Sequence, residues 1–141
     1  MEMGLILACL QPKEKLGGGK EAWQILVVDD EPAVSRAIKM MLEYCGHKVQ
    51  TASSGREALA MLEQGRFDLV TTDFSMPEMN GAALAIAIKQ RLPNQPVLMI
   101  SGNALMSQSA GNPLTGVDLV IGKPFLLDDL RKAIATILPE S

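Results

Sequence analysis

The sequence predicts an α/β fold in which strands and helices alternate around one parallel sheet. Short apolar runs rich in β-branched residues recur along the chain, as expected of strands covered on both faces. Between them lie segments with apolar residues at helical spacing. The 141 residues are 48% apolar and 21% charged, which suits one globular domain and excludes wholesale disorder. Strands and helices that alternate in this way form a parallel sheet with right-handed crossovers and helices on both faces.

Residues 1–21 are predicted to be an N-terminal tail or linker that precedes a domain at residues 22–141. Residues 11–20 (QPKEKLGGGK) mix charge, proline and glycine, which is typical of a linker. The longest apolar run, Leu5–Leu10, falls far short of the roughly 20 residues that span a bilayer, so no membrane contact is expected. The tail is expected to be a frayed extension, with a docking peptide as the alternative.

The first predicted strand is Ile25–Val28, which stops at two aspartates. The helix that follows has its apolar residues on one face over Val34–Cys45. Pro32 is expected to begin this helix and Gly46 to end it. A short second strand is predicted at Lys48–Ala52.

The rest of the domain repeats the same alternation. The remaining predicted elements are a helix from about Ala58 to Gly65, a strand at Asp68–Thr72, a helix at Ala82–Arg91, strands at Pro96–Ile100 and Asp118–Ile121, and a final helix at Leu127–Leu138. Between the last two strands, the run Gly111-Asn112-Pro113 is expected to cut a helix short.

Polar residues follow four of the predicted strands. Asp29 and Asp30 follow the first strand and Asp73 the third, while Ser101 and Lys123 follow the fourth and fifth. Ligands of open parallel sheets bind at this carboxyl edge. The second strand lacks such a group, which suggests that it lies at the side edge of the sheet.

Three neighbouring carboxylates repel one another, and a divalent cation or the ammonium of Lys123 can offset that repulsion. Mg²⁺ prefers carboxylate, water and phosphoryl oxygens. A cation, a lysine and a hydroxyl around one carboxylate stabilise a transferring phosphoryl group, and the carboxylate itself can be the nucleophile that forms an acyl phosphate. Taken singly, these residues also suit turns, helix caps or an exposed loop. Their order at four strand ends predicts a phosphoryl-transfer site.

Composition excludes several other classes of protein. Thirteen Lys and Arg against sixteen Asp and Glu give a net charge of −3, which argues against direct nucleic-acid binding. Cys9 and Cys45 form neither a CxxC pair nor a disulfide framework, which favours a reducing compartment. The single histidine, His47, leaves too few soft ligands for a zinc site.

The chain resembles the receiver domain of response regulators in two-component signalling. The resemblance covers about residues 24–138 and rests on ILVVDDEP, FDLVTTDFSMPEMNG, PVLMISGNA and GKPF. It implies a flavodoxin-like, doubly wound sheet of five strands in the order 2-1-3-4-5. It also implies a phosphoacceptor switch that turns over no separate substrate and places the protein in the cytoplasm. Because the sequence ends directly after the last predicted helix, a stand-alone receiver is expected, with a phosphorelay intermediate or a fragment of a longer regulator or hybrid kinase as the alternatives. The expected phosphate donor is a sensor histidine kinase or a histidine phosphotransfer protein, and the output is altered affinity for a downstream protein.

The resemblance assigns Mg²⁺ to the acidic residues. Asp73 would be phosphorylated and would contact the metal ion. Asp30 would bind Mg²⁺ directly, and Asp29 would bind it through water. The main-chain carbonyl of Ser75 would be a further ligand.

The resemblance also assigns the residues around the phosphoryl group. Ser101 would donate a hydrogen bond to it and shift on activation, and Lys123 would pair with it. The peptide bond before Pro124 would be cis, and Gly81 would close the loop after Asp73.

One residue departs from the family pattern. Receivers usually carry Tyr or Phe three residues before the lysine, and Val120 occupies that position, so the usual aromatic readout is missing. This departure keeps open an interaction module with the same fold that is never phosphorylated. A small Mg²⁺-dependent phosphatase is the other alternative, but such enzymes typically have a second Asp two residues after the nucleophile, where this chain has Ser75.

Overall fold

The computed structural model describes residues 22–102 and 115–138. The strands are β1 (Gln24–Val28), β2 (Lys48–Ala52), β3 (Leu69–Asp73), β4 (Val97–Ser101) and β5 (Leu119–Gly122). The helices of the described part are α2 (Pro32–Tyr44), α3 (Gly55–Gln64), α4 (Gly81–Arg91) and α6 (Leu127–Ile137). The predicted tail at residues 1–21 and the predicted helix break at residues 111–113 lie outside the described residues.

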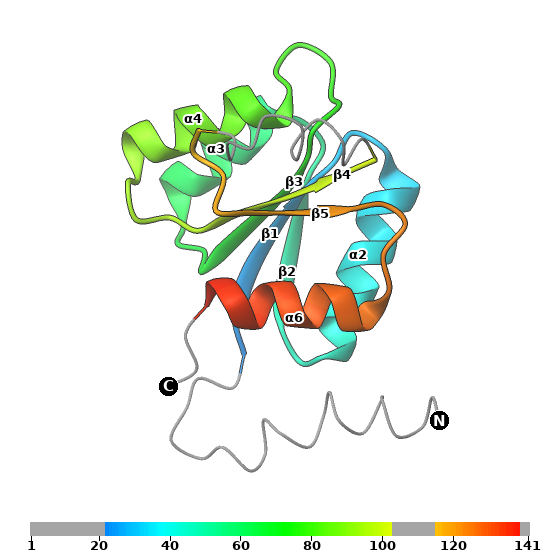
Figure 1. Ribbon diagram of the computed structural model, residues 1–141. Helices are drawn as coiled ribbons and strands as arrows, with labels where there is room; N and C mark the ends of the chain where they lie inside the picture. The colour runs from blue at the N-terminus through cyan, green and yellow to red at the C-terminus, as the bar shows by residue number, and fades with distance from the viewer. Residues whose placement is uncertain (1–21, 103–114, 139–141) are drawn as a thin grey trace, which may run out of the picture.

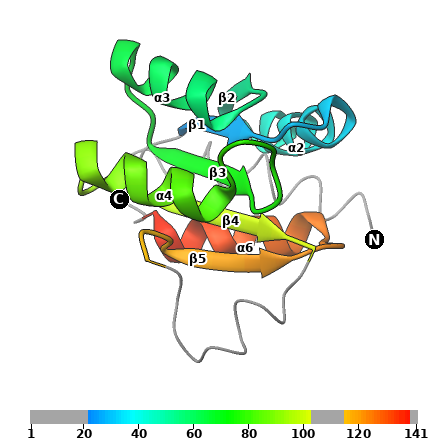
Figure 2. The same ribbon diagram turned by 90° about the horizontal axis from the view of Figure 1, so that it is seen from above.

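The five strands form one sheet in the order β2-β1-β3-β4-β5, and all four neighbouring pairs are parallel. This order confirms the expected doubly wound α/β fold and places β2 at one edge. Figures 1 and 2 show three layers, with α3 and α4 on one side of the sheet and α2 and α6 on the other. Within the described residues, no helix is both long enough and apolar enough to cross a membrane.

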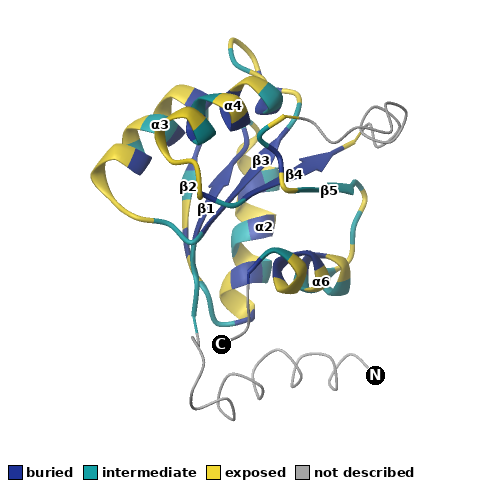
Figure 3. Ribbon diagram, turned by 60° about the vertical axis from the view of Figure 1, so that its left-hand side comes forward, coloured by how far each residue is buried: buried dark blue, intermediate teal, exposed yellow. Residues whose placement is uncertain are grey.

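Successive residues of each inner strand face opposite sides of the sheet. In β1, Ile25 and Val27 pack with α2 and α6, whereas Leu26 and Val28 pack with α3 and α4. All four side chains are at most 1% exposed, which explains why β1 is a continuous apolar run. Burial of each such side chain stabilises the fold by roughly 1.5–3 kcal/mol. Figure 3 shows the buried sheet and the exposed outer faces of the helices.

Several predicted boundaries are wrong by one to three residues. The predictions that the third strand ends at Thr72 and the fourth at Ile100 are wrong, because β3 and β4 continue through Asp73 and Ser101. The backbone pairs with its neighbour at these positions although the side chains are polar. The helix predicted from Ala58 begins earlier, at Gly55, because the Ser54 hydroxyl accepts a hydrogen bond from the backbone of the first turn.

Two aspartates, Asp68 and Asp118, each fix the start of one pair of neighbouring strands by the same hydrogen bonds. The Asp68 carboxylate accepts a hydrogen bond from the Gln24 N–H at 2.8 Å, and the Asp68 N–H donates to the Gln24 carbonyl at 2.7 Å. Asp118 makes the same two bonds with Val97, at 2.8 and 2.9 Å. Each aspartate directly precedes a strand, and its partner is the first residue of the adjacent strand. The two aspartates therefore set the register of β3 against β1 and of β5 against β4.

Candidate phosphoryl-transfer site

The predicted site residues meet at the carboxyl edge of the sheet. Asp29 directly follows β1, and Asp73 is the last residue of β3. Ser101 is the last residue of β4, and Lys123 directly follows β5. Parallel pairing of these strands brings residues from four separate parts of the chain to one place. The edge strand β2 supplies none of the predicted site residues.

Asp29, Asp30 and Asp73 form an acidic cluster in which the ligand oxygens all lie within 4.8 Å of one another. Asp29 is 3% exposed and Asp73 is 9% exposed. Burial raises the pKa of the Asp29 carboxyl above its ordinary value, a hydrogen bond from the Glu31 N–H lowers this pKa, and the nearby charge of Asp73 raises it further. The cluster therefore holds negative charge at a cost in free energy that a cation would reduce.

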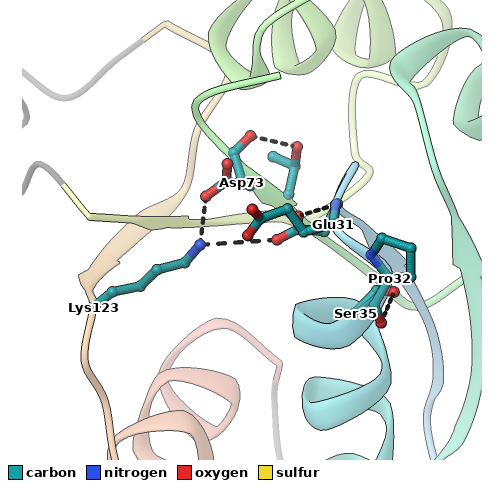
Figure 4. A network of polar contacts seen from close by, with 7 residues as sticks. Glu31, Pro32, Ser35, Asp73 and Lys123 are labelled. Carbon is teal, nitrogen blue, oxygen red and sulfur yellow. Dashed lines mark hydrogen bonds and ion pairs between the residues drawn. The ribbon is translucent and has the colours of Figure 1, made fainter. Parts of the chain in front are cut away.

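Lys123 brings positive charge to this cluster. Its Nζ lies 2.8 Å from Oδ1 of Asp73 and 3.8 Å from Oδ2 of Asp29 (Figure 4). The lysine side chain is 28% exposed, so its ammonium reaches the buried carboxylates from the rim of the site. One ammonium offsets only part of the charge of three carboxylates.

The residues of the cluster fit a Mg²⁺ ion. Mg²⁺ binds oxygens at about 2.0–2.1 Å in octahedral geometry, so two ligands on opposite sides of it lie roughly 4.2 Å apart. The carboxylate oxygens of the cluster lie up to 4.8 Å apart, which slightly exceeds the separation of opposite ligands around Mg²⁺. They match such an ion if one carboxylate binds through water or if side chains move by less than about 1 Å.

Ser101 lies beside Lys123 at the same edge. Its side chain is buried, with 5% of the residue exposed. Ser101 pairs with Gly122 of β5, and its carbonyl accepts a hydrogen bond from the Lys123 N–H at 2.9 Å. Pairing of β4 with β5 thus brings Ser101 and Lys123 to the same edge of the sheet, where the Lys123 ammonium contacts Asp73.

The loop after Asp73 is closed by Gly81, as the resemblance implies. The Gly81 N–H donates a hydrogen bond to the Phe74 carbonyl at 2.8 Å. A Cβ atom at Gly81 would collide with the carbonyl oxygen of Asp73 and would lie 3.0 Å from Cα of Phe74. Only glycine fits here without moving the backbone that carries Asp73. Ser75 lies in the same loop and is exposed.

Two further predicted positions lie on β5 and just after it. Val120 is half-buried, pairs with Met99 of β4 and packs against the apolar cluster on the α3 and α4 side. The peptide bond between Lys123 and Pro124 is cis, the isomer that the resemblance implies.

Two hydrogen bonds that support the site were not expected from the sequence. The Glu31 N–H donates to Oδ1 of Asp29 at 2.9 Å, and the Thr72 hydroxyl donates to the Asp73 carbonyl at 3.0 Å (Figure 4). The first is an Asx-type turn, which an aspartate two residues before the N-cap residue of a helix makes recognisable in sequence. The second depends on the side-chain rotamer of a buried threonine, for which the sequence carries no signal.

Comparison with known proteins agrees with this geometry. The sequence matches the family model described as "Response regulator receiver domain" over residues 25–135. It is 37% identical to the chemotaxis protein CheY of Pseudomonas aeruginosa over 117 residues, which cover 81% of this chain and 94% of CheY. It is 32% identical over 128 residues to the sensor histidine kinase RcsC of Salmonella typhi, covering 91% of this chain but only 14% of RcsC.

Solved structures show the same similarity. A response regulator receiver domain protein from Clostridium thermocellum superposes with a TM-score of 0.74 at 32% identity, covering 81% of this chain and 92% of that one. The response regulator TrrA of Thermotoga maritima, solved in complex with Mg²⁺-BeF, gives a TM-score of 0.74 at 29% identity and covers 82% of this chain and 99% of that one.

Proposed function

Because this chain belongs to the response-regulator receiver family of two-component signalling, we propose that it is a phosphoacceptor switch modified on Asp73. The observation that carries the proposal is the contact of 2.8 Å between Lys123 Nζ and Asp73 Oδ1, made within a cluster of three carboxylates. In this proposal residues 22–141 are the receiver domain and residues 1–21 precede it. The expected location is the cytoplasm.

The proposed reaction is an in-line transfer between a donor nitrogen and a carboxylate. An Asp73 oxygen attacks phosphorus as the bond from phosphorus to a histidine nitrogen of the partner protein breaks, which leaves an acyl phosphate. Lys123 then pairs with a phosphoryl oxygen, and the Ser101 hydroxyl donates a hydrogen bond to another. Attack of water on phosphorus later releases phosphate and restores the Asp73 carboxylate.

Mg²⁺ belongs to the same proposal. Asp30 and Asp73 would bind it directly, Asp29 through water, and the Ser75 carbonyl would complete the protein ligands. Bound there, it would neutralise charge that develops on the phosphoryl oxygens. Support comes from the spacing and burial of the carboxylates and from the Mg²⁺-BeF complex of the similar TrrA protein.

The partners follow from this chemistry. A sensor histidine kinase or a histidine phosphotransfer protein would supply the phosphoryl group, and a downstream protein would bind the phosphorylated form. The similarity to the kinase RcsC and to CheY supports a place in such a pathway. Neither nucleic acid nor a membrane has a role in this proposal.

Intact-mass spectrometry with small phosphate donors tests the proposal. With Mg²⁺ and either acetyl phosphate or phosphoramidate, whose P–N bond resembles that of phosphohistidine, the chain should gain one phosphoryl group. Asp73→Asn should abolish the gain, as should removal of Mg²⁺ by chelation. Asp128→Asn, a change at a partly exposed aspartate of α6, is the matched control and should be modified like the parent chain.

One observation favours a second candidate. Val120 replaces the usual aromatic residue, which suits an interaction module that needs no phosphate. If neither donor modifies the chain, and Asp73→Asn leaves partner binding unchanged, this second candidate is preferred.

A further inference from the structure

A cavity of about 450 Å³ lies at the amino edge of the sheet, opposite the phosphoryl-transfer site. It is bounded by the ends of α3 and α4, which lie side by side on one face of the sheet (Figures 1 and 2), and by the segments that lead into β3 and β4. Cavities of this size with mainly apolar walls are typical of sites for small molecules. The function proposed above uses none of its residues. The apolar walls are Leu62, Phe67, Leu92, Pro93 and Pro96.

The side chain of Gln95 also lines this cavity. Gln95 is only 7% exposed, although glutamine side chains mostly lie at protein surfaces. Its Nε2 donates a long hydrogen bond of 3.3 Å to the carbonyl of Pro96. That carbonyl already accepts a hydrogen bond from the Val70 N–H at 3.1 Å. Within the described residues, Oε1 of Gln95 has no hydrogen-bond partner.

The Oε1 atom of Gln95 is accessible from the cavity. Among the described residues, no fully buried side-chain nitrogen or oxygen lacks a hydrogen-bond partner, so an oxygen of Gln95 without one must meet solvent. The cavity that Gln95 lines provides this access. A carbonyl oxygen that is largely removed from water without a partner raises the free energy of the folded chain, and a donor from a ligand would reduce this cost. The cavity therefore offers one hydrogen-bond acceptor to a ligand.

The charges around the cavity favour a neutral ligand with a donor group. The C-cap residues of α3 and α4, Gly65 and Leu92, both line the cavity. The last carbonyls of a helix lack partners within it, so the two helix ends bring partial negative charge. The charged residues among the described lining, Arg66 and Asp68, have opposite signs. An N–H donor on an uncharged molecule fits these surroundings better than an anion does.

We propose that this cavity binds a small, neutral aromatic molecule through a ring N–H that donates to Oε1 of Gln95. Phe67 and Leu92 pack against the ring in this site. The proposal does not rest on phosphorylation of Asp73. Gln95 lies six residues before Ser101 on a largely extended segment, so the site is roughly 20 Å from the carboxyl edge of the sheet. A bound molecule therefore leaves the phosphoryl-transfer site open.

Titration with two probes, followed by heteronuclear NMR of the amide groups, tests the proposal in the full chain. Indole and benzofuran have nearly the same shape, but benzofuran carries an oxygen in place of the ring N–H. Indole should shift the backbone signals of Phe67 and Leu92 and the side-chain amide signal of Gln95. The backbone signals of Asp29 and Lys123 should not move. We expect indole to bind roughly three- to tenfold more tightly than benzofuran, which is the effect of one hydrogen bond.

Two variants separate the hydrogen bond from the apolar contacts. Gln95→Met removes the acceptor and keeps the length of the side chain, so it should make the affinities of the two probes about equal. Leu92→Ser changes a wall residue that is 38% exposed and should weaken both probes. Leu126→Ser is the matched control, because Leu126 is 72% exposed and lies outside the cavity lining, and it should weaken neither probe. Dispersed amide signals establish that each variant is folded.

Three outcomes overturn the proposal. If neither probe shifts the signals of Phe67, Leu92 and Gln95 at millimolar concentration, the cavity takes no such ligand. Equal affinities of indole and benzofuran for the parent chain would mean that Gln95 accepts no hydrogen bond from the ring. Unchanged binding in Leu92→Ser would place the probes elsewhere. The probe pair and Leu92→Ser leave Gln95 in place, so they decide the matter if Gln95→Met does not fold.

Discussion

The charge of the buried Asp29 carboxylate lowers the stability of the fold. Burial raises its pKa above the ordinary value of 3.8, and the charge of Asp73 acts in the same direction. A carboxyl whose pKa is higher in the folded chain binds its proton more tightly there. Ionisation of Asp29 therefore lowers the free energy of unfolding as the pH rises above 3.8, and this loss is complete above the folded pKa.

Asp29→Asn should accordingly stabilise the metal-free protein at pH 7, by about 1 kcal/mol or roughly 3–6 °C in Tm. The amide oxygen can still accept the hydrogen bond from the Glu31 N–H. The gain should shrink as the pH falls toward 3.8, where the parent carboxyl is protonated. Thermal unfolding in chelator between pH 4 and 8 measures it, with Asp128→Asn as control. No gain at pH 7, or an equal gain at pH 4, would contradict this account.

The sequence alone predicted which side chains gather at the site, because strand ends of a parallel sheet meet at one edge. Asp29, Asp73 and Lys123 lie together as the pattern indicates. The sequence did not predict the hydrogen bond that the Thr72 hydroxyl donates to the Asp73 carbonyl. Nor could it predict that Asp30 is less buried than Asp29, since burial depends on how β1 ends against its neighbours.

At the scale of the elements, Asp68 aligns β3 with β1 and Asp118 aligns β5 with β4 through the same pair of hydrogen bonds. Each carboxylate accepts the first N–H of the adjacent strand. Asp118 also forms an ion pair with Lys89 of α4 at 2.9 Å, and thereby ties α4 to the start of β5. Both aspartates occur in the same context, Asp-Leu-Val, after an apolar residue. Sequence reasoning missed their role because the partner strand is distant in the chain.

Asp68→Ala should leave the Gln24 N–H without its acceptor and destabilise the fold by about 1–3 kcal/mol. Asp68→Asn keeps an oxygen at the same place and should cost less. Chemical denaturation of both variants, compared with Asp128→Ala on α6, measures the difference. If the Asn and Ala variants lose equal stability, the hydrogen bond is not the cause of the loss.

Element boundaries were the less predictable part of the fold. Asp73 and Ser101 looked like residues that follow strands, because their side chains are polar. Backbone pairing nevertheless continues through both residues, since Asp73 pairs with Ile100 and Ser101 pairs with Gly122. The early start of α3 was recognisable in principle, since Ser54 and Glu57 have the spacing of a capping box.

Across the whole molecule, filling the site with Mg²⁺ should stabilise every strand that contributes to it. A ligand at about ten times its dissociation constant adds roughly 1.4 kcal/mol to the free energy of unfolding. Tm should therefore rise with Mg²⁺ and not with NaCl of equal ionic strength. Asp30→Asn should abolish this rise and Asp128→Asn should keep it. A rise of equal size in the Asp30→Asn variant would place the ion elsewhere.

The sequence separation of the site residues has a consequence for protein synthesis. Lys123 and its partner Asp73 are 50 residues apart, and the lysine follows the last strand of the sheet. A nascent chain that has left the ribosome only through β4 would hold the three carboxylates without their ammonium group. At about 5–20 residues per second, that interval lasts on the order of seconds. Only after β5 has paired with β4 does Lys123 reach Asp73, so under the proposed function an unfinished chain would lack one of the groups needed to accept a phosphoryl group.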